Sequence, residues 1–349
     1  MAIDEADLKL ALDQISDWYL PEQNALEGFI YPNASPIREF HFLYETAERL
    51  LAQCVEKTEK SHDRDFGLDG DYDEFVVRVN ERSYRGHRIE TVEGYFYALR
   101  RMPISVPSLS DLEFEPALRK VLLSENLSKG GLVIICGETG QGKSTTCAAT
   151  IKERMSQLGS FCLTVEDPPE MPLHGRHGNG RCLQTSVRAG NFADAMRGAM
   201  RCFPTVTGSM LYVGETRDSE TALEVLRIAM NGNLVFTTLH AQDVPSALKR
   251  MVSLASGRMG PGGEQEASDI LASVFRIGMH QTLESMRPIP GKPIKKKLTI
   301  SFLLSHSPQT PVANKIRKKE TEALGTDIQQ QQAILRNHGA NALLKMWDT

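Results

Sequence analysis

The clearest chemistry in the sequence lies in a glycine-rich run, Gly137-Glu138-Thr139-Gly140-Gln141-Gly142-Lys143-Ser144, which Thr145 follows. The pattern G-x-x-x-x-G-K-[ST] is typical of a phosphate-binding loop, because its glycines let successive backbone N–H groups turn toward phosphate oxygens. We expect Lys143 to reach the β and γ phosphates of a nucleotide and Ser144 to offer its hydroxyl to Mg²⁺. The alternative, an accidental glycine turn, is disfavoured because an apolar run precedes the loop and a helical pattern follows it.

Two acidic positions end apolar runs further along the chain. Glu166-Asp167 ends one run, and Glu215 follows Gly214 at the end of another. Ligands of open α/β sheets bind at the carboxyl ends of the strands, where such acids would lie. Hydrolysis needs a carboxylate that orients or deprotonates water and acids that help to hold hydrated Mg²⁺. Glu215 is therefore the candidate base and Glu166 the candidate support for the metal; the alternative is that both acids end strands only because strands emerge into solvent.

A histidine, His240, closes the next apolar run, which ends Thr237-Thr238-Leu239. A neutral imidazole at the end of a strand in this sheet could sense the γ-phosphate through a hydrogen bond. The alternative is that His240 merely caps the strand.

The elements expected to position these residues alternate between strands and helices. Continuous apolar runs indicate strands buried on both faces of a parallel sheet, and they occur at 132–136, 161–165, 210–214 and 234–239. Helical patterns fall between them at 143–157, 192–200 and 219–230. This alternation predicts an open α/β sheet with right-handed crossovers. After Val244 we expect mostly helix, interrupted by a glycine-rich segment at 256–263 and a strand at 298–304.

The first hundred residues differ from this pattern. A helical stretch at 40–56, a charged loop at 57–73, a strand at 74–79 and a short run at 95–101 indicate a separate α+β domain. Residues 104–110 hold proline and serine without periodicity, as an inter-domain linker does. We therefore expect domains at 1–103 and 111–349, joined by a linker at 104–110.

Composition indicates a soluble globular protein. The chain has 349 residues, of which 41% are hydrophobic and 24% charged, and its net charge is -4. The acidic start does not resemble a signal peptide, and no run reaches the ~18 apolar residues of a membrane span. Six scattered cysteines without a C-x-x-C pair favour reduced thiols over a disulfide framework. A cytoplasmic location is therefore expected.

Four segments, in this order, resemble the secretion ATPase superfamily, whose members drive pilus retraction, type II secretion, type IV secretion and conjugation. They are GETGQGKST (137–145), LTVEDPPE (163–170), LYVGETRDSETA (211–222) and GNLVFTTLH (232–240). In that family they are the Walker A loop, the Asp box, the Walker B segment and the His box. The resemblance covers about residues 75–332. It implies a RecA-like P-loop ATPase core with a smaller PAS-like α+β N-terminal domain, ATP and Mg²⁺ as ligands, and a homo-hexamer. It also implies inner-membrane secretion or pilus machinery as partners, through which the protein would associate peripherally with that membrane.

The same resemblance gives a role to arginines upstream of the linker. Arg78 and Arg100 match positions that the family points at the γ-phosphate, and Arg101 is adjacent. Arginines of this kind are worth about 10³–10⁵ in turnover, because they stabilise charge on the transferring phosphoryl group. Arg217 could instead pair with a nearby acid. Without the motif match, solvated arginines are the simpler interpretation, and action in cis or from a neighbouring subunit stays open.

Departures from the family narrow the expected function. The His box usually has a second histidine, which is Asn233 here, and the tetracysteine zinc module of many members is missing. The late signature of retraction ATPases corresponds to residues 311–318, where only Asn314, Ile316 and Arg317 are kept. Type IVB secretion and conjugation therefore become the expected subgroup, with pilus retraction as the alternative.

Other functions remain as alternatives. A nucleic-acid translocase on the same core is disfavoured by the acidic net charge, and no direct nucleic-acid contact is expected. An assembly factor that binds ATP but scarcely hydrolyses it is a third hypothesis. His174, His177 and Cys182 have a spacing that could bind zinc, although a polar loop is the simpler interpretation. The basic clusters 292–297 and 315–319 could face acidic lipid or a partner, although solvated faces are simpler.

Overall fold

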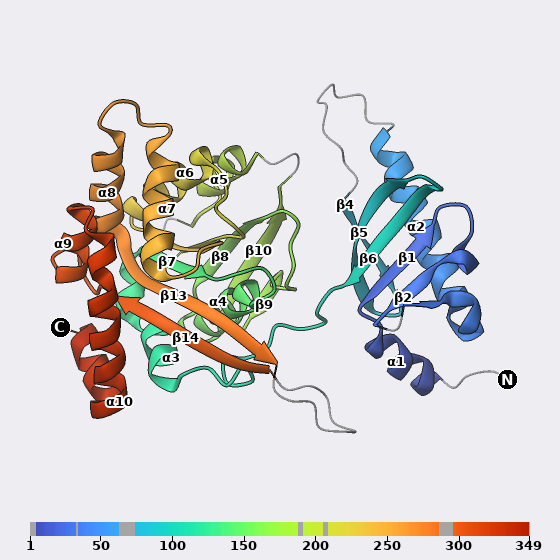
Figure 1. Ribbon diagram of the computed structural model, residues 1–349, viewed down its shortest axis with the longest axis horizontal. Helices are drawn as coiled ribbons and strands as arrows, with labels where there is room; N and C mark the ends of the chain where they lie inside the picture. The colour runs from blue at the N-terminus through green and yellow to red at the C-terminus, as the bar shows by residue number, and fades with distance from the viewer. Residues whose placement is uncertain are drawn as a thin grey trace. The chain divides into compact units, whose positions relative to one another are not determined.

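The chain divides after Ser105 into two units, each built on its own β-sheet (Figure 1). The computed structural model describes residues 5–32, 34–62, 74–187, 191–204, 209–285 and 296–348. The first unit comprises Met1–Ser105 and the second Val106–Thr349. Val106 and Leu109, which fall in the segment expected as a linker, are buried in the core of the second unit.

The first unit is a six-stranded antiparallel sheet in the order β3-β2-β1-β6-β5-β4, with its helices packed on one face. Residues of α1 and α2, such as Leu12 and Leu50, share a core with Val77, Tyr84 and Leu99 of the sheet. The elements are α1 (Glu5–Gln14), β1 (Asp17–Pro21), η1 (Ala25–Glu27), β2 (Phe29–Tyr31), β3 (Ser35–Pro36), η2 (Ile37–Glu39), η3 (His41–Leu43), α2 (Tyr44–His62), β4 (Glu74–Val79), β5 (Arg82–Thr91) and β6 (Gly94–Arg101).

The second unit is built on an eight-stranded sheet in the order β14-β13-β7-β12-β11-β8-β10-β9. Its inner strands are parallel, and β14 and β9 join antiparallel at the two edges. The strands are β7 (Gly131–Cys136), β8 (Phe161–Glu166), β9 (Gly175–His177), β10 (Gly180–Ser186), β11 (Met210–Val213), β12 (Leu234–Leu239), β13 (Phe275–Ser285) and β14 (Lys296–Leu304).

Helices cover both faces of this sheet, as its buried parallel strands require. One core gathers α5 to α9 and the other gathers α3, α4 and the end of α10. The helices are α3 (Pro116–Leu122), η4 (Glu125–Lys129), α4 (Lys143–Leu158), α5 (Phe192–Met200), α6 (Ser219–Met230), α7 (Val244–Ser256), α8 (Gly263–Val274), α9 (Pro311–Arg317), η5 (Thr321–Ala323) and α10 (Leu324–Asp348).

The expected alternation of strands and helices from residue 132 to 239 is confirmed, but three strands of the second unit were missed: β13, β10 and the short β9, which lies where a polar loop was expected. Residues 275–285 were expected to be helical and form β13, because pairing with β7 and β14 buries Phe275, Ile277 and Met279 at every second position. The polar segment 180–186 forms β10, which pairs with β8 near the sheet edge. In the first unit, α2 continues to His62, through the start of the charged segment that was expected to be a loop.

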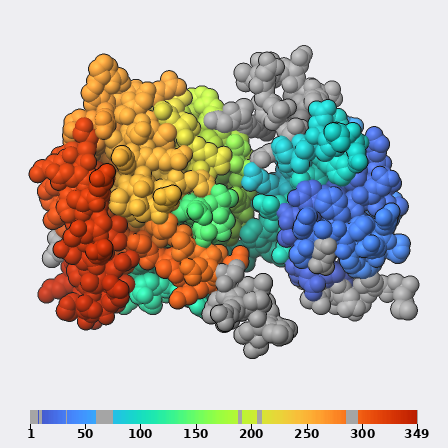
Figure 2. All heavy atoms as spheres, in the orientation of Figure 1, coloured from blue at the N-terminus to red at the C-terminus, as the bar shows by residue number. Residues whose placement is uncertain are grey.

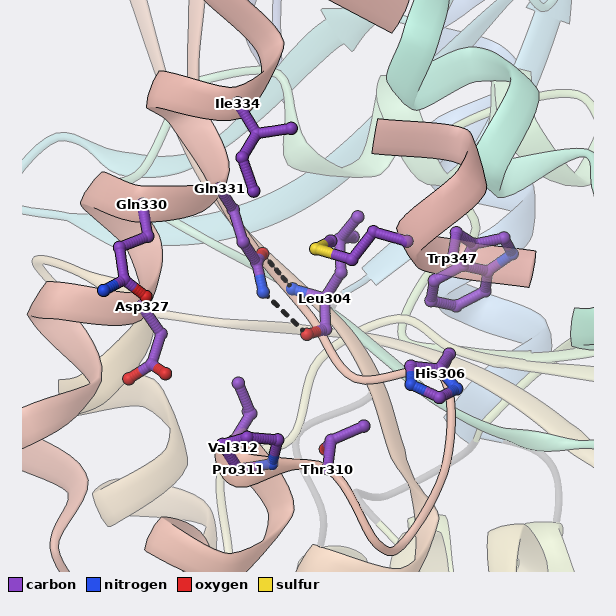
Figure 3. A pocket seen from close by; sticks show the side chains of 11 residues that line it. Leu304, His306, Thr310, Pro311, Val312, Asp327, Gln330, Gln331, Ile334 and Trp347 are labelled. Atoms are coloured by element: carbon purple, nitrogen blue, oxygen red, sulfur yellow. Dashed lines mark hydrogen bonds between the residues drawn. The ribbon is translucent and has the colours of Figure 1, made fainter. Parts of the chain in front are cut away.

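The C-terminal helices lie together on one side of the second unit, where Figure 2 shows α9 and α10 as red spheres. The side-chain amide of Gln331 on α10 bonds both the N–H and the C=O of Leu304, the last residue of β14, at 2.8 and 2.9 Å (Figure 3). A cavity of about 250 Å³ opens beside this contact, lined by Thr310, Ile334 and Trp347 among others. Within the ranges that the structure describes, no helix is long and apolar enough to cross a membrane.

Candidate nucleotide-binding and hydrolysis site

The phosphate loop joins the end of β7 to the start of α4, the position expected from the sequence. Gly137, Gly140 and Gly142 have φ angles of 149°, 78° and 77°, which L-residues with side chains rarely adopt. A Cβ added to Gly137 would lie 2.5 Å from the backbone oxygen of Gln281, so glycine is also required there by space. Because α4 is 16 residues long and begins at Lys143, its positive N-terminal end adds to an anion site.

Lys143 is held inside this loop, with 7% of its surface exposed. Its Nζ donates to the carbonyl oxygens of Gly137 at 2.9 Å and Glu138 at 2.7 Å. Burial lowers the pKa of Lys143, while the negative charge of Glu215 acts in the opposite direction. The amine is therefore preorganised over the loop, where it can bind phosphate oxygens.

Glu166 ends β8 in a site that water barely reaches, with 3% of its surface exposed. Burial raises the pKa of Glu166 to about 7, and a hydrogen bond from Gln184 Nε2, at 2.8 Å to Oε1, partly offsets this. A Cβ on Gly214 would lie 3.4 Å from Glu166 Cγ, so the ends of β8 and β11 are adjacent. Asp167 is exposed at the next position.

Glu215 follows β11, and its carboxylate lies between the side chains of Arg217 and His240. Its Oε2 accepts from Arg217 at 2.8 Å, and its Oε1 lies 3.3 Å from His240 Nε2. The backbone beneath it is fixed by Thr238 Oγ1, which donates to the carbonyl of Gly214 at 2.6 Å. The sequence placed Glu215 and His240 on neighbouring strand ends, and the structure brings them together. Arg217 pairs with this same acid.

Two glutamines that were not expected in the site, the buried Gln281 and the half-buried Gln184, support the loop and Glu166. Gln281 of β13 contacts the loop, and Gln184 of β10 holds Glu166 and donates to the carbonyl of Met171 at 2.7 Å. Gln281 and Gln184 both lie on strands that were not expected. The apolar residues Phe275, Ile277 and Met279 at every second position were the available signal for a strand.

The arginines of the first unit lie on one face of its sheet. Arg100 is directly opposite Arg85 on β5, and Arg78 on β4 is two residues from the partner of Arg85, so strand alternation gives all three the same side. Arg100 Nε also donates to Asp17 at 2.9 Å, with 77% of the arginine side chain exposed. Arg101 differs, because its Nη1 donates to the carbonyls of Leu12 and Asp13 near the end of α1.

The residues suggested as zinc ligands belong to the β9–β10 hairpin and the residue before it. His177 Nε2 lies 2.8 Å from the carbonyl of Leu173, and His174 Nδ1 accepts from the backbone of Gln184 at 3.3 Å. Cys182 is buried beside Cys162 across β10 and β8. Among the residues that the structure describes, no group of three or more His, Cys, Asp or Glu side chains could hold a metal.

The basic cluster 315–319 is tied into the helices. Lys315 pairs with Asp327 at 2.6 Å, Arg317 approaches Asp269 at 4.0 Å and Lys319 approaches Glu264 at 3.9 Å. Of the other basic cluster, 292–297, residues 292–295 lie outside the described residues.

Comparisons with known proteins agree with the four motifs. Residues 74–286 match the family model described as Type II/IV secretion system protein. The chain is 32% identical over 270 residues to the Escherichia coli (strain K12) "Uncharacterized protein YggR", covering 76% of this chain and 75% of that one. It is 36% identical over 150 residues to the Pseudomonas aeruginosa type IV pilus retractation ATPase PilT, covering 39% of this chain and 41% of that one.

Two solved structures share the fold. The pilus retraction motor PilT with bound ADP has a TM-score of 0.72 at 24% identity, covering 95% of this chain and 91% of that one. The Legionella pneumophila ATPase DotB has a TM-score of 0.62 at 20% identity, covering 97% and 94%. The expected RecA-like core with a smaller PAS-like N-terminal domain is thereby confirmed. The chain belongs to the type II/IV secretion system ATPase family.

Proposed function

We propose that this protein hydrolyses ATP to ADP and phosphate, with Glu215 as the base that activates water. The observation that carries this proposal is the position of Glu215, at the end of β11, contacting His240 and Arg217 and acting electrostatically on Lys143. A water oxygen would attack the γ-phosphorus while the bond to the leaving ADP oxygen breaks, and Glu215 would take the proton of that water. His240 is the residue we expect to sense the γ-phosphate.

Binding of the nucleotide is assigned to the loop 137–145. Three positive-φ glycines and the N-terminus of α4 supply backbone N–H groups, and Lys143 supplies a cation for the β and γ phosphates. These features fit a polyphosphate anion because backbone donors and the positive charge of Lys143 converge on one loop.

The donor set also fits Mg²⁺, a hard cation that prefers oxygen ligands and keeps several waters. The Ser144 hydroxyl would bind the ion, and the Glu166 carboxylate would hold the ion's waters. Glu166 fits this role because it is buried at the end of β8 with its pKa raised by burial, so a nearby cation would favour its ionised form. When bound, Mg²⁺ neutralises charge on the phosphates.

The arginine-bearing face of the first unit is proposed to complete the site. Arg78 and Arg100 would stabilise charge on the γ-phosphate, either within the chain or from a neighbouring subunit of a homo-hexamer. Their common face on the sheet supports this, because one docking movement would bring both to the nucleotide. Hydrolysis would then change the angle between the units near Ser105, a hinge-type transition.

The proposed load is a bacterial type IV secretion or conjugation system at the inner membrane, with a type IV pilus as the alternative. The altered segment 311–318 supports the first, and the similarity to pilus ATPases supports the second. Cross-linking in cells followed by identification of inner-membrane partners would separate them: secretion-channel subunits support the first and pilus-platform subunits the second.

Steady-state phosphate release from the purified protein tests the activity, with Lys143→Ala as the inactive control. We expect turnover that the control lacks, and hexamers by native mass spectrometry when nucleotide is present. Turnover that appears only with single-stranded nucleic acid, and falls steeply with salt, would favour the translocase alternative. Nucleotide binding without measurable turnover would favour the assembly-factor alternative.

A further inference from the structure

Gln281 is a buried polar residue that the hydrolysis mechanism does not use. It belongs to β13, the strand that pairs with β7 just before the phosphate loop, where His280 lies opposite Cys136. Only 2% of its surface is exposed. Its backbone oxygen is the atom that leaves no room for a side chain at Gly137, so β13 and the start of the loop are in direct contact.

The side-chain amide of Gln281 joins the loop to the helix that follows it. Its Nε2 donates to the carbonyl oxygen of Gln141 at 2.5 Å, and its Oε1 accepts from Thr146 Oγ1 at 2.8 Å. Gln141 returns the contact, since its own Oε1 accepts from the backbone N–H of Leu283 on β13. Gln141 therefore connects the loop to β13 twice, through its backbone carbonyl and through its side chain.

The bond to Gln141 fixes the direction of a peptide group. In a trans peptide the C=O of one residue and the N–H of the next point to opposite sides. With the Gln141 carbonyl held toward β13, the N–H of Gly142 points away from β13. We propose that Gln281 is a positioning residue, which holds the Gln141–Gly142 peptide so that the Gly142 N–H faces the phosphates. This inference rests on the proposed nucleotide site but assigns it a support outside the four motifs.

A matched control is available because the same unit contains a second buried glutamine. Gln331 is 6% exposed and also makes one donated and one accepted hydrogen bond through its amide, both to Leu304. Gln281→Met and Gln331→Met remove equivalent contacts while keeping the chain length of the side chain. Both variants should lower thermal stability by similar amounts. Only Gln281→Met should also change the phosphate loop, because Gln331 contacts Leu304 and not the loop.

The experiment measures ADP binding by isothermal titration calorimetry in the full-length protein. We expect Gln281→Met to raise the Kd for ADP at least about tenfold, since one lost hydrogen bond has about this effect, and Gln331→Met to change it less than about twofold. Thr146→Val should weaken binding by itself and add little in the Gln281→Met background, because both act through one bond. An unchanged Kd in Gln281→Met, or an equal change in Gln331→Met, overturns the proposal.

Two further results keep the test decisive. If Gln281→Met does not fold, Gln141→Ala removes the contact with Leu283 from a partly exposed position and should also raise the Kd, whereas an unchanged Kd would count against the loop's dependence on β13. If the unmodified protein does not bind ADP, the proposed nucleotide site itself fails. If it binds ADP and Gln281→Met binds equally well, only the positioning role fails.

Discussion

Glu166→Gln should stabilise the second unit at high pH and leave it unchanged at low pH. The carboxyl is buried at the end of β8, and burial raises its pKa from 4.5 to about 7. The folded protein therefore holds a proton that the unfolded chain releases between these values. Stability then falls as pH rises from about 4.5 to about 7, because the unfolded state binds fewer protons in that interval. Above pH 7 the full cost of ionising a buried carboxyl is present.

The size of the effect follows from the difference between the pKa of Glu166 in the unfolded chain and in the folded protein. At about 1.4 kcal/mol per pH unit, the difference between the folded and unfolded pKa corresponds to about 3 kcal/mol of unfolding free energy. Glutamine has the same shape and keeps an oxygen that can accept from Gln184, but it has no charge to bury. We therefore expect Glu166→Gln to raise the unfolding free energy by up to about 3 kcal/mol at pH 8 and by little at pH 5.

Urea unfolding followed by tryptophan fluorescence can measure this for the second unit alone. The chain has two tryptophans, Trp18 in the first unit and Trp347 in the second, and both are buried. A Trp18→Phe background leaves Trp347 as the reporter, and the packing that it removes lies in the core of the first unit rather than in the second. If Glu166→Gln changes the unfolding free energy by the same amount at pH 5 and pH 8, this carboxyl is already ionised in the folded protein and the reasoning is refuted.

Two comparisons of neighbouring residues test the rest of the site. Gly137→Ala should abolish ATP binding in a filter assay, because its Cβ would clash with the backbone of β13, whereas Gly140→Ala, which has open space, should weaken binding less; equal losses would contradict the steric role of β13. Arg100→Ala should reduce phosphate release by at least about tenfold with little change in melting temperature. Arg101→Ala should instead lower the melting temperature, since Arg101 ties the end of α1 to the sheet; a loss of turnover without loss of stability in Arg101→Ala would reverse these assignments.

The phosphate site could be predicted from sequence because its chemistry is local. The loop, the strand before it and the helix after it are contiguous, so residue type and spacing define them together. Glu215 and His240 were also predictable, since parallel strands place their carboxyl ends at one edge of a sheet. Their contact at 3.3 Å follows from the adjacency of β11 and β12.

The supports of the site were not predictable in the same way. Residues 275–285 follow α8 without a break, and only pairing with β7 and β14 makes them a strand. Gln281 therefore carries no local signal of its contact with a loop about 140 residues earlier in the chain. Gln184 was missed for a similar reason, because β10 is polar and is defined by its pairing with β8. Tertiary pairing overrides local pattern in both cases.

The most direct test of the account is Glu215→Gln, measured for both nucleotide binding and phosphate release. The substitution keeps the shape of the side chain but removes the carboxylate that would take a proton from water. We predict that ATP binds with a Kd within about threefold of the unmodified protein while turnover falls by at least about 10²-fold. Undiminished turnover in Glu215→Gln would remove this residue from the mechanism and contradict the proposed site.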